Sequence, residues 1–130
     1  MLLDARSVVF PDPQLTPTGR HLTSLFSQMG ISEAMRPKVT LRNAIDGGVN
    51  LVRDGKVEVG LFLVTEILPV EGIKLVGTLP AALQGYVVYV AAVSADSGAS
   101  EAALKFVDFL SDPRLRDYWT NAGFEQVGGR

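Results

Sequence analysis

Apolar positions in the first third of the chain form one short run and then one helical stripe. Ser7–Phe10 is expected to be a strand, because Pro11-Asp12-Pro13 follows and two prolines so close together prevent a helix. The next segment favours a helix that starts at Thr16-Pro17, with Thr16 as the N-cap and Gly30 as its left-handed end. Its apolar residues recur at helical spacing. They are Leu22, Leu25, Phe26 and Met29.

The middle of the chain continues the alternation of short elements. A brief turn from Ser32 is expected to end at Pro37, and Val39–Leu41 reads as a short strand. Asn43 is the expected N-cap of a helix that Gly55 ends. The nearly continuous apolar run 57–64 predicts a central parallel strand covered on both faces. A helical turn at 65–68 and a strand at 73–76 complete this region.

The last third changes from strand to helix. Tyr86–Val93 is the longest run of strand-forming residues and predicts a strand. Ser100 is the expected cap of one helix, and Asp112-Pro113 predicts the start of a last helix that Gly123 ends. Strands separated by helices favour an α/β fold with a parallel or mixed sheet, and disfavour a sandwich or a bundle.

Composition narrows the classes of protein. The chain has 130 residues, 47% of them hydrophobic, with 12 Lys and Arg against 14 Asp and Glu for a net charge of −2. This length and apolar content predict a compact core, and the balanced charge argues against nucleic-acid binding. The absence of cysteine excludes disulfides and thiolate sites, and the single histidine excludes a histidine-rich metal centre. No signal peptide is recognisable at Met1-Leu2-Leu3, and no apolar run approaches the ~20 residues of a membrane span.

Two predicted helix starts are the best candidates for chemistry. Thr16–Gly19 and Asn43–Gly48 combine free N–H groups, the positive end of a helix dipole and small residues, which together suit a small anion. At the first start, Gly19→Val should block an anion without disturbing the fold. Ordinary helix capping is the simpler explanation of both segments, because every helix has an N-terminus, and Asp46 would repel an anion at the second.

Other polar residues have simpler explanations. Thr65, directly after the apolar run, stands where open α/β sheets bind ligands, although a helix cap explains it too. His21 has no second ligating residue nearby and is expected to be a surface or hydrogen-bonded histidine. Asp12 and Asp46 suit turn and first-turn roles better than an acid–base pair. The sequence therefore shows no catalytic set, so we expect no enzyme, no cofactor and no metal.

The order of several segments resembles a known family. FPDP, TPTG, LVRDGKVEVGL, EILPVEGIKLVGTLPAALQGY and KFVDFLSDP…AGFE follow one another as in the substrate-binding proteins of molybdate-type ABC transporters. The resemblance extends from about Ala5 to Gln126. It implies the type II periplasmic binding protein fold, in which an oxyanion is held between two α/β lobes.

The resemblance also implies a division of the chain. Residues 1–85 resemble the second, substrate-binding lobe, and residues 86–130 resemble the hinge strand and the helices that pack on the first lobe. The N-terminal half of the first lobe has no counterpart, so the chain is expected to be truncated. By this resemblance, the binding residues match Thr18-Gly19 and Ile45-Asp46, and the family's oxyanion-binding tyrosine falls near Leu63, whose side chain donates no hydrogen bond.

Two functions follow as expectations. The first is a non-catalytic solute-binding protein of an ABC-type import system, periplasmic or extracytoplasmic, with a small anion or polar metabolite as ligand and an ABC permease as partner. The alternative is the ligand-sensing domain of a transcription regulator with the same fold. Because the C-terminal helices would expose an apolar patch without a first lobe, we also expect a homodimer with exchanged segments. Since no apolar run is long enough to span a bilayer, we expect no direct membrane insertion.

Overall fold

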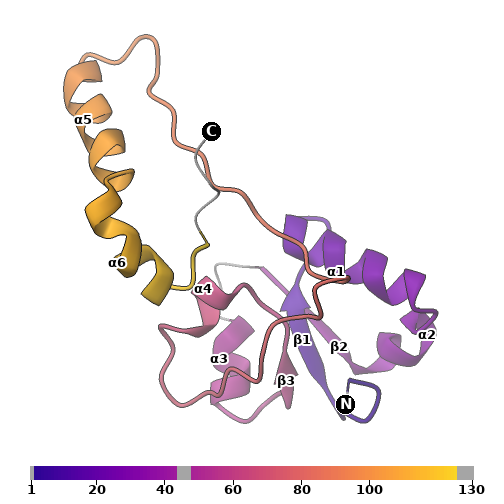
Figure 1. Ribbon diagram of the computed structural model, residues 1–130. Helices are drawn as coiled ribbons and strands as arrows, with labels where there is room; N and C mark the ends of the chain where they lie inside the picture. The colour runs from indigo at the N-terminus through magenta and orange to yellow at the C-terminus, as the bar shows by residue number, and fades with distance from the viewer. Residues whose placement is uncertain (1, 44–47, 126–130) are drawn as a thin grey trace. The chain divides into compact units, whose positions relative to one another are not determined.

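The chain is described by a computed structural model (Figure 1), which places residues 2–43 and 48–125. It divides into two compact units, residues 1–87 and 88–130. The interpretation of residues 1–85 as a substrate-binding lobe and 86–130 as a first-lobe remnant stays a prediction.

The N-terminal unit contains a three-stranded sheet with the order β2-β1-β3. β1 (Val8–Pro11) pairs in parallel with β2 (Val39–Arg42) and with β3 (Val59–Gly60). The predicted α/β class with a parallel sheet is therefore confirmed. All four residues of β1 are buried, as expected of a strand that is paired on both edges and packed on both faces.

The prediction of a central strand over 57–64 is wrong. β3 is two residues long and lies at the edge of the sheet. The pairing ends at the hydrogen bond from the Leu61 amide to the Val9 carbonyl (2.9 Å), after which the chain leaves the sheet. The ring of Phe62 then lies against Gly60, where a Cβ would be 2.5 Å from it. The apolar run 57–64 therefore contains a short strand and the loop after it, whose Phe62 ring packs back on the strand.

α1 (Pro17–Gln28) follows β1 and begins as predicted. The Thr16 side chain accepts a hydrogen bond from the Gly19 amide (3.0 Å), and Pro17 occupies the first helical position. Gly30 has a φ of 68°, which confirms the predicted left-handed end. Leu22, Leu25 and Phe26 are buried, whereas Met29, also predicted for the core face, is 53% exposed.

Shorter helices connect the remaining strands. They are α2 (Ser32–Met35), η1 (Arg36–Lys38), α3 (Gly48–Arg53) and α4 (Val64–Ile67). Pro37 lies inside the 3₁₀ helix η1 and does not end the segment, because proline fits the first turn of a helix. Gly55, with a φ of 68°, follows α3 as predicted. The predicted start of that helix at 43–47 extends outside the described residues.

The core lies between β1 and α1. It consists of Ala5, Val8, Phe10, Leu22, Phe26 and Met35. The rings of Phe10 and Phe26 meet edge to face, with 5.6 Å between their centres. This contact fixes α1 on one face of the sheet, and α3 also packs against β1.

Two predicted strands are absent from the described residues. Residues 73–76 and 86–93 have no ladder of hydrogen bonds to another segment. Val88, Tyr89 and Val90 are 64%, 64% and 88% exposed. A strand needs a neighbour for its backbone groups, so strand-forming residues without one remain extended chain.

The C-terminal unit holds α5 (Ser100–Leu110), η2 (Pro113–Leu115) and α6 (Arg116–Asn121). Asp112 caps η2 as predicted, by accepting a hydrogen bond from the Arg114 amide (2.8 Å). Ser100, however, is the first helical residue, and the N-cap Ala99 makes no side-chain hydrogen bond, so the predicted Ser100 cap is wrong. The Trp119 indole donates to the Leu110 carbonyl (3.0 Å) and ties α6 to the end of α5.

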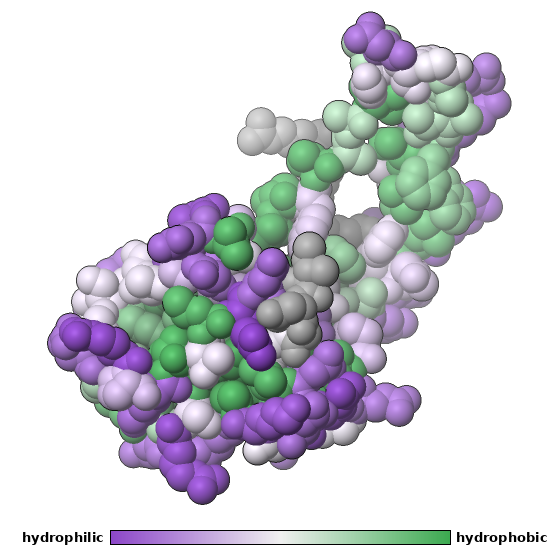
Figure 2. All heavy atoms as spheres, turned by 180° about the vertical axis from the view of Figure 1, so that it is seen from behind, coloured by the Kyte–Doolittle hydropathy of each residue, from purple (hydrophilic) through white to green (hydrophobic). Residues whose placement is uncertain are grey.

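The predicted apolar faces of these helices are not buried within the structure. No residue of α5 or α6 is buried, and Figure 2 shows hydrophobic side chains at the surface of the C-terminal helices. The large exposed ones are Leu104, Phe106, Phe109 and Tyr118.

Candidate functional site

The carboxyl ends of the three strands form one edge of the sheet. From β1 the chain crosses through α1 to β2, and from β2 it crosses back through α3 to β3 on the other side of β1. Because such crossovers are right-handed, α1 and α3 lie on opposite faces of the sheet, as Figure 1 shows. The direction of connection therefore reverses between β1 and β3, and open α/β sheets bind ligands at such a switch point.

The turn after β1 is built around Asp12. Its carboxylate accepts a hydrogen bond from the Gln14 amide (2.7 Å), and its carbonyl accepts from the Thr16 amide (2.9 Å) and the Thr16 hydroxyl (3.0 Å). Asp12 thus has the turn role that the sequence favoured over acid–base chemistry. The turn is held by its own polar groups, and the start of α1 is fixed relative to the end of β1.

Gly19 is required by packing. A Cβ at this position would lie 2.2 Å from the Pro11 carbonyl oxygen and 2.6 Å from the Pro13 nitrogen, both backbone atoms. Its amide already donates to Thr16. Gly19→Val would therefore disturb the fold, and the prediction that the fold would stay intact is wrong.

Thr18 is the group left available at the start of α1. Neither its amide nor its hydroxyl has a hydrogen-bond partner among the described residues, and its side chain is half-buried. Pro17 has no N–H, and the Gly19 amide is occupied. Among the first three residues of α1, Thr18 is therefore the one whose amide has no hydrogen-bond partner among the described residues.

The segment after β3 carries Thr65 at the same edge of the sheet. Thr65 lies in α4 and is half-buried. The neighbouring Glu66 accepts a hydrogen bond from the Leu63 amide (3.2 Å), which caps this short helix. Burial raises the pKa of Glu66, and the hydrogen bond from Leu63 opposes that rise. Thr18 and Thr65 thus follow the two strands that flank the switch point, whereas Ile45 and Asp46 lie outside the described residues.

The Phe62 ring explains why residues 48 and 60 are glycines. The sequence suggested that Gly48 leaves room for a ligand, and it gave no reason for Gly60. A Cβ on Gly48 would be 3.1 Å from the Phe62 ring, and one on Gly60 would be 2.5 Å from it. The ring therefore occupies the space that both glycines leave. This contact could have been predicted from the sequence, because Gly60 ends an apolar run and an aromatic residue follows two positions later.

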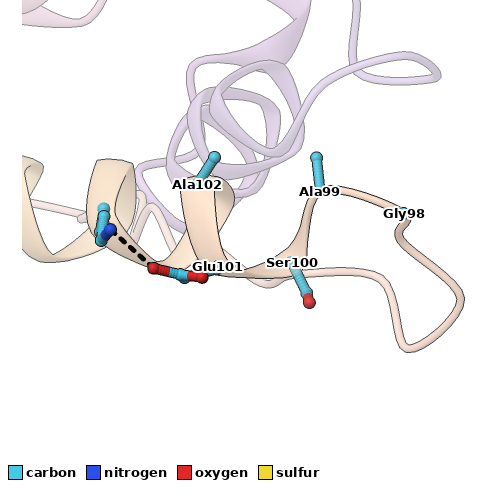
Figure 3. A pocket seen from close by; sticks show the side chains of 6 residues that line it. Gly98, Ala99, Ser100, Glu101 and Ala102 are labelled. Atoms are coloured by element: carbon cyan, nitrogen blue, oxygen red, sulfur yellow. Dashed lines mark hydrogen bonds and ion pairs between the residues drawn. The ribbon is translucent and has the colours of Figure 1, made fainter.

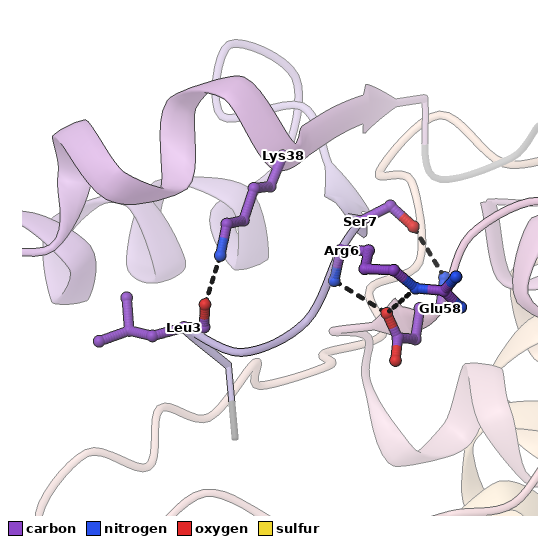
Figure 4. Close-up of polar contacts among 5 residues, drawn as sticks. All are labelled: Leu3, Arg6, Ser7, Lys38 and Glu58. Atoms are coloured by element: carbon purple, nitrogen blue, oxygen red, sulfur yellow. Dashed lines mark hydrogen bonds and ion pairs between the residues drawn. The ribbon is translucent and has the colours of Figure 1, made fainter.

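Polar contacts at the opposite end of the sheet hold the N-terminal segment (Figure 4). The Glu58 carboxylate accepts from the Arg6 amide (2.8 Å) and pairs with the Arg6 guanidinium (3.4 Å), while the Glu58 amide donates to the Ser7 hydroxyl (3.0 Å). The hydrogen bond from the Arg6 amide, helped by its guanidinium, lowers the pKa of Glu58. Lys38 donates to the Leu3 carbonyl. These contacts are structural and lie away from the carboxyl edge.

An open hollow of about 480 Å³ lies at the start of α5 (Figure 3). Its lining residues are Gly98, Ala99, Ser100, Glu101, Ala102 and Lys105. Glu101 and Lys105 pair with each other (2.7 Å), one turn apart on the helix. All these residues belong to one short stretch of chain, so the hollow is an open depression at the start of one helix.

Residues 2–43 and 48–125 contain neither a candidate metal site nor a candidate membrane span. Within these ranges, no three His, Asp or Glu side chains are grouped so that they could hold a metal ion. None of the helices described there has the length and apolarity needed to cross a membrane.

Comparison with known proteins decides the family. The family of bacterial extracellular solute-binding proteins matches residues 1–125. The chain belongs to this family. It is also 25% identical over 124 residues to the molybdate-binding protein ModA of Escherichia coli strain K12. That alignment covers 95% of the chain and 48% of ModA, so the chain spans about half the length of this relative. No solved structure matches the chain.

Proposed function

We propose that this chain forms one lobe of a non-catalytic solute receptor, which binds a small oxyanion for an ABC-type importer outside the cytoplasm. The family is one of extracellular solute-binding proteins, and the relative ModA is named for molybdate binding. On this proposal the lobe has the type II periplasmic binding protein fold, and an ABC permease is its partner.

The uncommitted Thr18 amide at the start of α1 is the observation that supports the proposal most. A helix N-terminus with a free amide and a nearby hydroxyl favours an anion, because both donors point at it and the helix dipole adds positive potential. The Asp12 turn fixes this start beside the β1–β3 switch point, and Thr65 follows the other strand there. We assign Thr18 as a ligand-binding residue and Thr65 as a second one, and we keep Ile45 and Asp46 as proposed members of the site.

Calorimetric titration of the 130-residue chain with molybdate, tungstate and sulfate tests this function. Thr18→Val removes the hydroxyl at nearly constant shape, and we expect about a tenfold loss of affinity, the effect of one hydrogen bond to a charged group. Thr23→Val on the exposed part of the same helix is the matched control and should bind like the parent. Absence of heat with all three anions would sink the oxyanion assignment, and equal losses in both variants would sink Thr18.

We also propose that the chain forms a homodimer. An 11-residue helix such as α5 is marginal in water without a packing partner, and its large apolar side chains Leu104, Phe106 and Phe109 are more than half exposed. A second copy would cover them, with the extended segment 86–93 free to exchange between chains. Light scattering after size exclusion checks this, and a species near 13.9 kDa at micromolar concentration would contradict it.

A further inference from the structure

His21 makes the most specific long-range contact of α1 that neither the core nor the proposed ligand site uses. Its Nε2 lies 2.9 Å from the Leu83 carbonyl oxygen, 62 positions further along the chain. The carbonyl can only accept, so Nε2 must carry the proton. The side chain is half-buried, in agreement with the expectation of a hydrogen-bonded histidine.

The backbone of Gly85 packs directly against the His21 ring. A Cβ on Gly85 would be 2.8 Å from Nε2 and 2.9 Å from two carbon atoms of the imidazole ring. The φ of Gly85 is not in the left-handed region, so the turn itself does not require glycine. The missing side chain is needed because the histidine ring lies directly against the backbone.

The segment that His21 holds is the one that leaves the N-terminal unit. Leu79 still packs against the core, turn hydrogen bonds follow from Leu83 to Pro80 (2.7 Å), and the unit ends at Val87. Between Leu79 and that end, the His21 contact is the side-chain hydrogen bond that joins this segment to a helix among the described residues. The other hydrogen bonds of this segment to described residues, such as the one from the Leu83 amide to the Pro80 carbonyl, stay within the segment itself.

We propose that His21 is a positioning residue that latches residues 83–87 to α1 and so fixes where the chain leaves the N-terminal unit. The contact shortens the free stretch of chain between the two units. A shorter free linker raises the effective concentration of one unit near the other, and this favours any binding step that needs both units. Thr18 precedes His21 by one turn on the same helix. If the proposed function holds, an oxyanion at Thr18 stabilises the latch, and by linkage the latch raises oxyanion affinity by the same factor.

The single histidine makes the latch directly observable. In ¹⁵N-edited NMR spectra of the full chain, we expect the Nε2–H tautomer with a slowly exchanging proton. Gly85→Ala should abolish that slow exchange by displacing the ring, whereas Gly98→Ala, where a Cβ meets no atom within 4 Å, should not. An Nδ1–H tautomer, or an unchanged signal in Gly85→Ala, would overturn the latch.

Cleavage by chymotrypsin gives an independent reading. His21→Leu should raise cleavage after Leu83 and Tyr86 about fivefold, the factor for one net hydrogen bond, while cleavage after Tyr89 in the other unit serves as internal reference. His21→Gln, which keeps a donor at similar reach, should restore the parental pattern. If Gln fails to rescue, or if all sites respond alike, His21 is only a packing residue.

Molybdate separates the two proposals. If both hold, molybdate slows exchange at His21, and His21→Leu weakens molybdate binding by the same factor. A latch signal that is intact in a chain that gives no heat with molybdate contradicts the proposed function alone. A molybdate affinity that is parental in His21→Leu contradicts the coupling alone.

Discussion

The N-terminal unit and the C-terminal unit carry helices of similar length but very different burial. α1 has 12 residues and buries Leu22, Leu25 and Phe26, whereas α5 has 11 residues and buries none. Both sequences have helical apolar spacing. The difference is that α1 packs on β1, a fully buried strand, whereas α5 has only half-buried residues on its most covered face. Amphipathic spacing thus specifies a helix with an apolar face, and only a facing element turns that face into core.

Truncation of one phenylalanine in each unit should give the largest difference in the free energy of unfolding. Phe26→Ala removes an almost fully buried ring that packs on Phe10, and we expect a loss of about 3–5 kcal/mol in the free energy of unfolding. Phe109→Ala removes a ring that is 55% exposed within one chain, so in a monomer it should change the free energy of unfolding by about 0.5 kcal/mol or less, whereas burial of that ring in the proposed dimer would make the loss larger. Urea unfolding followed by circular dichroism measures both. Similar losses would mean that α5 is buried in solution, as in the proposed dimer.

Replacement of one glycine by alanine in each unit should give the next largest difference in stability. Gly19→Ala drives a Cβ to 2.2 Å from the Pro11 carbonyl oxygen, and overpacking against backbone costs about 1–3 kcal/mol. Gly98→Ala in the other unit meets open space and should leave stability unchanged or slightly raised. Thermal unfolding of the pair checks this. A Gly19→Ala variant as stable as the parent would show that the β1–α1 turn can give way.

Removal of a hydroxyl at each helix start should have a smaller effect. Thr16→Ala loses the hydrogen bond that caps α1 and should destabilise the N-terminal unit by about 1 kcal/mol. Ser100→Ala should have almost no effect, because Ser100 caps nothing. Hydrogen exchange in the first turns of α1 and α5 compares the two sites. A comparable loss at Ser100 would restore the capping role that the sequence predicted.

The smallest expected effect is the response of η2 to acid. Hydrogen bonds from the Arg114 guanidinium and amide lower the pKa of Asp112 from 3.8 to about 2. A carboxyl group with a lowered folded-state pKa stabilises the fold above its unfolded-state value, and this contribution is lost as pH falls through the folded-state value. The cap of η2 should therefore weaken between about pH 4 and pH 2. A carbon-detected titration of Asp112 measures the pKa, which Arg114→Gln should raise towards its ordinary value.

Local features of the fold could be predicted from the sequence wherever neighbours along the chain decide them. The Thr16-Pro17 start, the Gly30 and Gly55 ends and the Asp112 cap all depend on bonds within a few residues, and all were confirmed. The candidate site stays a prediction. Thr18 was singled out because it opens a helix after a strand.

The tertiary structure decided which elements have partners. The apolar run 57–64 and the strand-forming run 86–93 have the composition of strands, yet one contributes two residues to a sheet edge and the other pairs with nothing described. Gly19 was interpreted as an opening for a ligand and instead admits the backbone of Pro11 and Pro13, and His21 reaches Leu83. Spacing along the chain determined the helices and most of their ends, because these depend on neighbouring residues. Only the tertiary structure determined the core around β1, the switch point between β1 and β3, and the contact from His21 to Leu83, because each joins segments that are distant in the sequence.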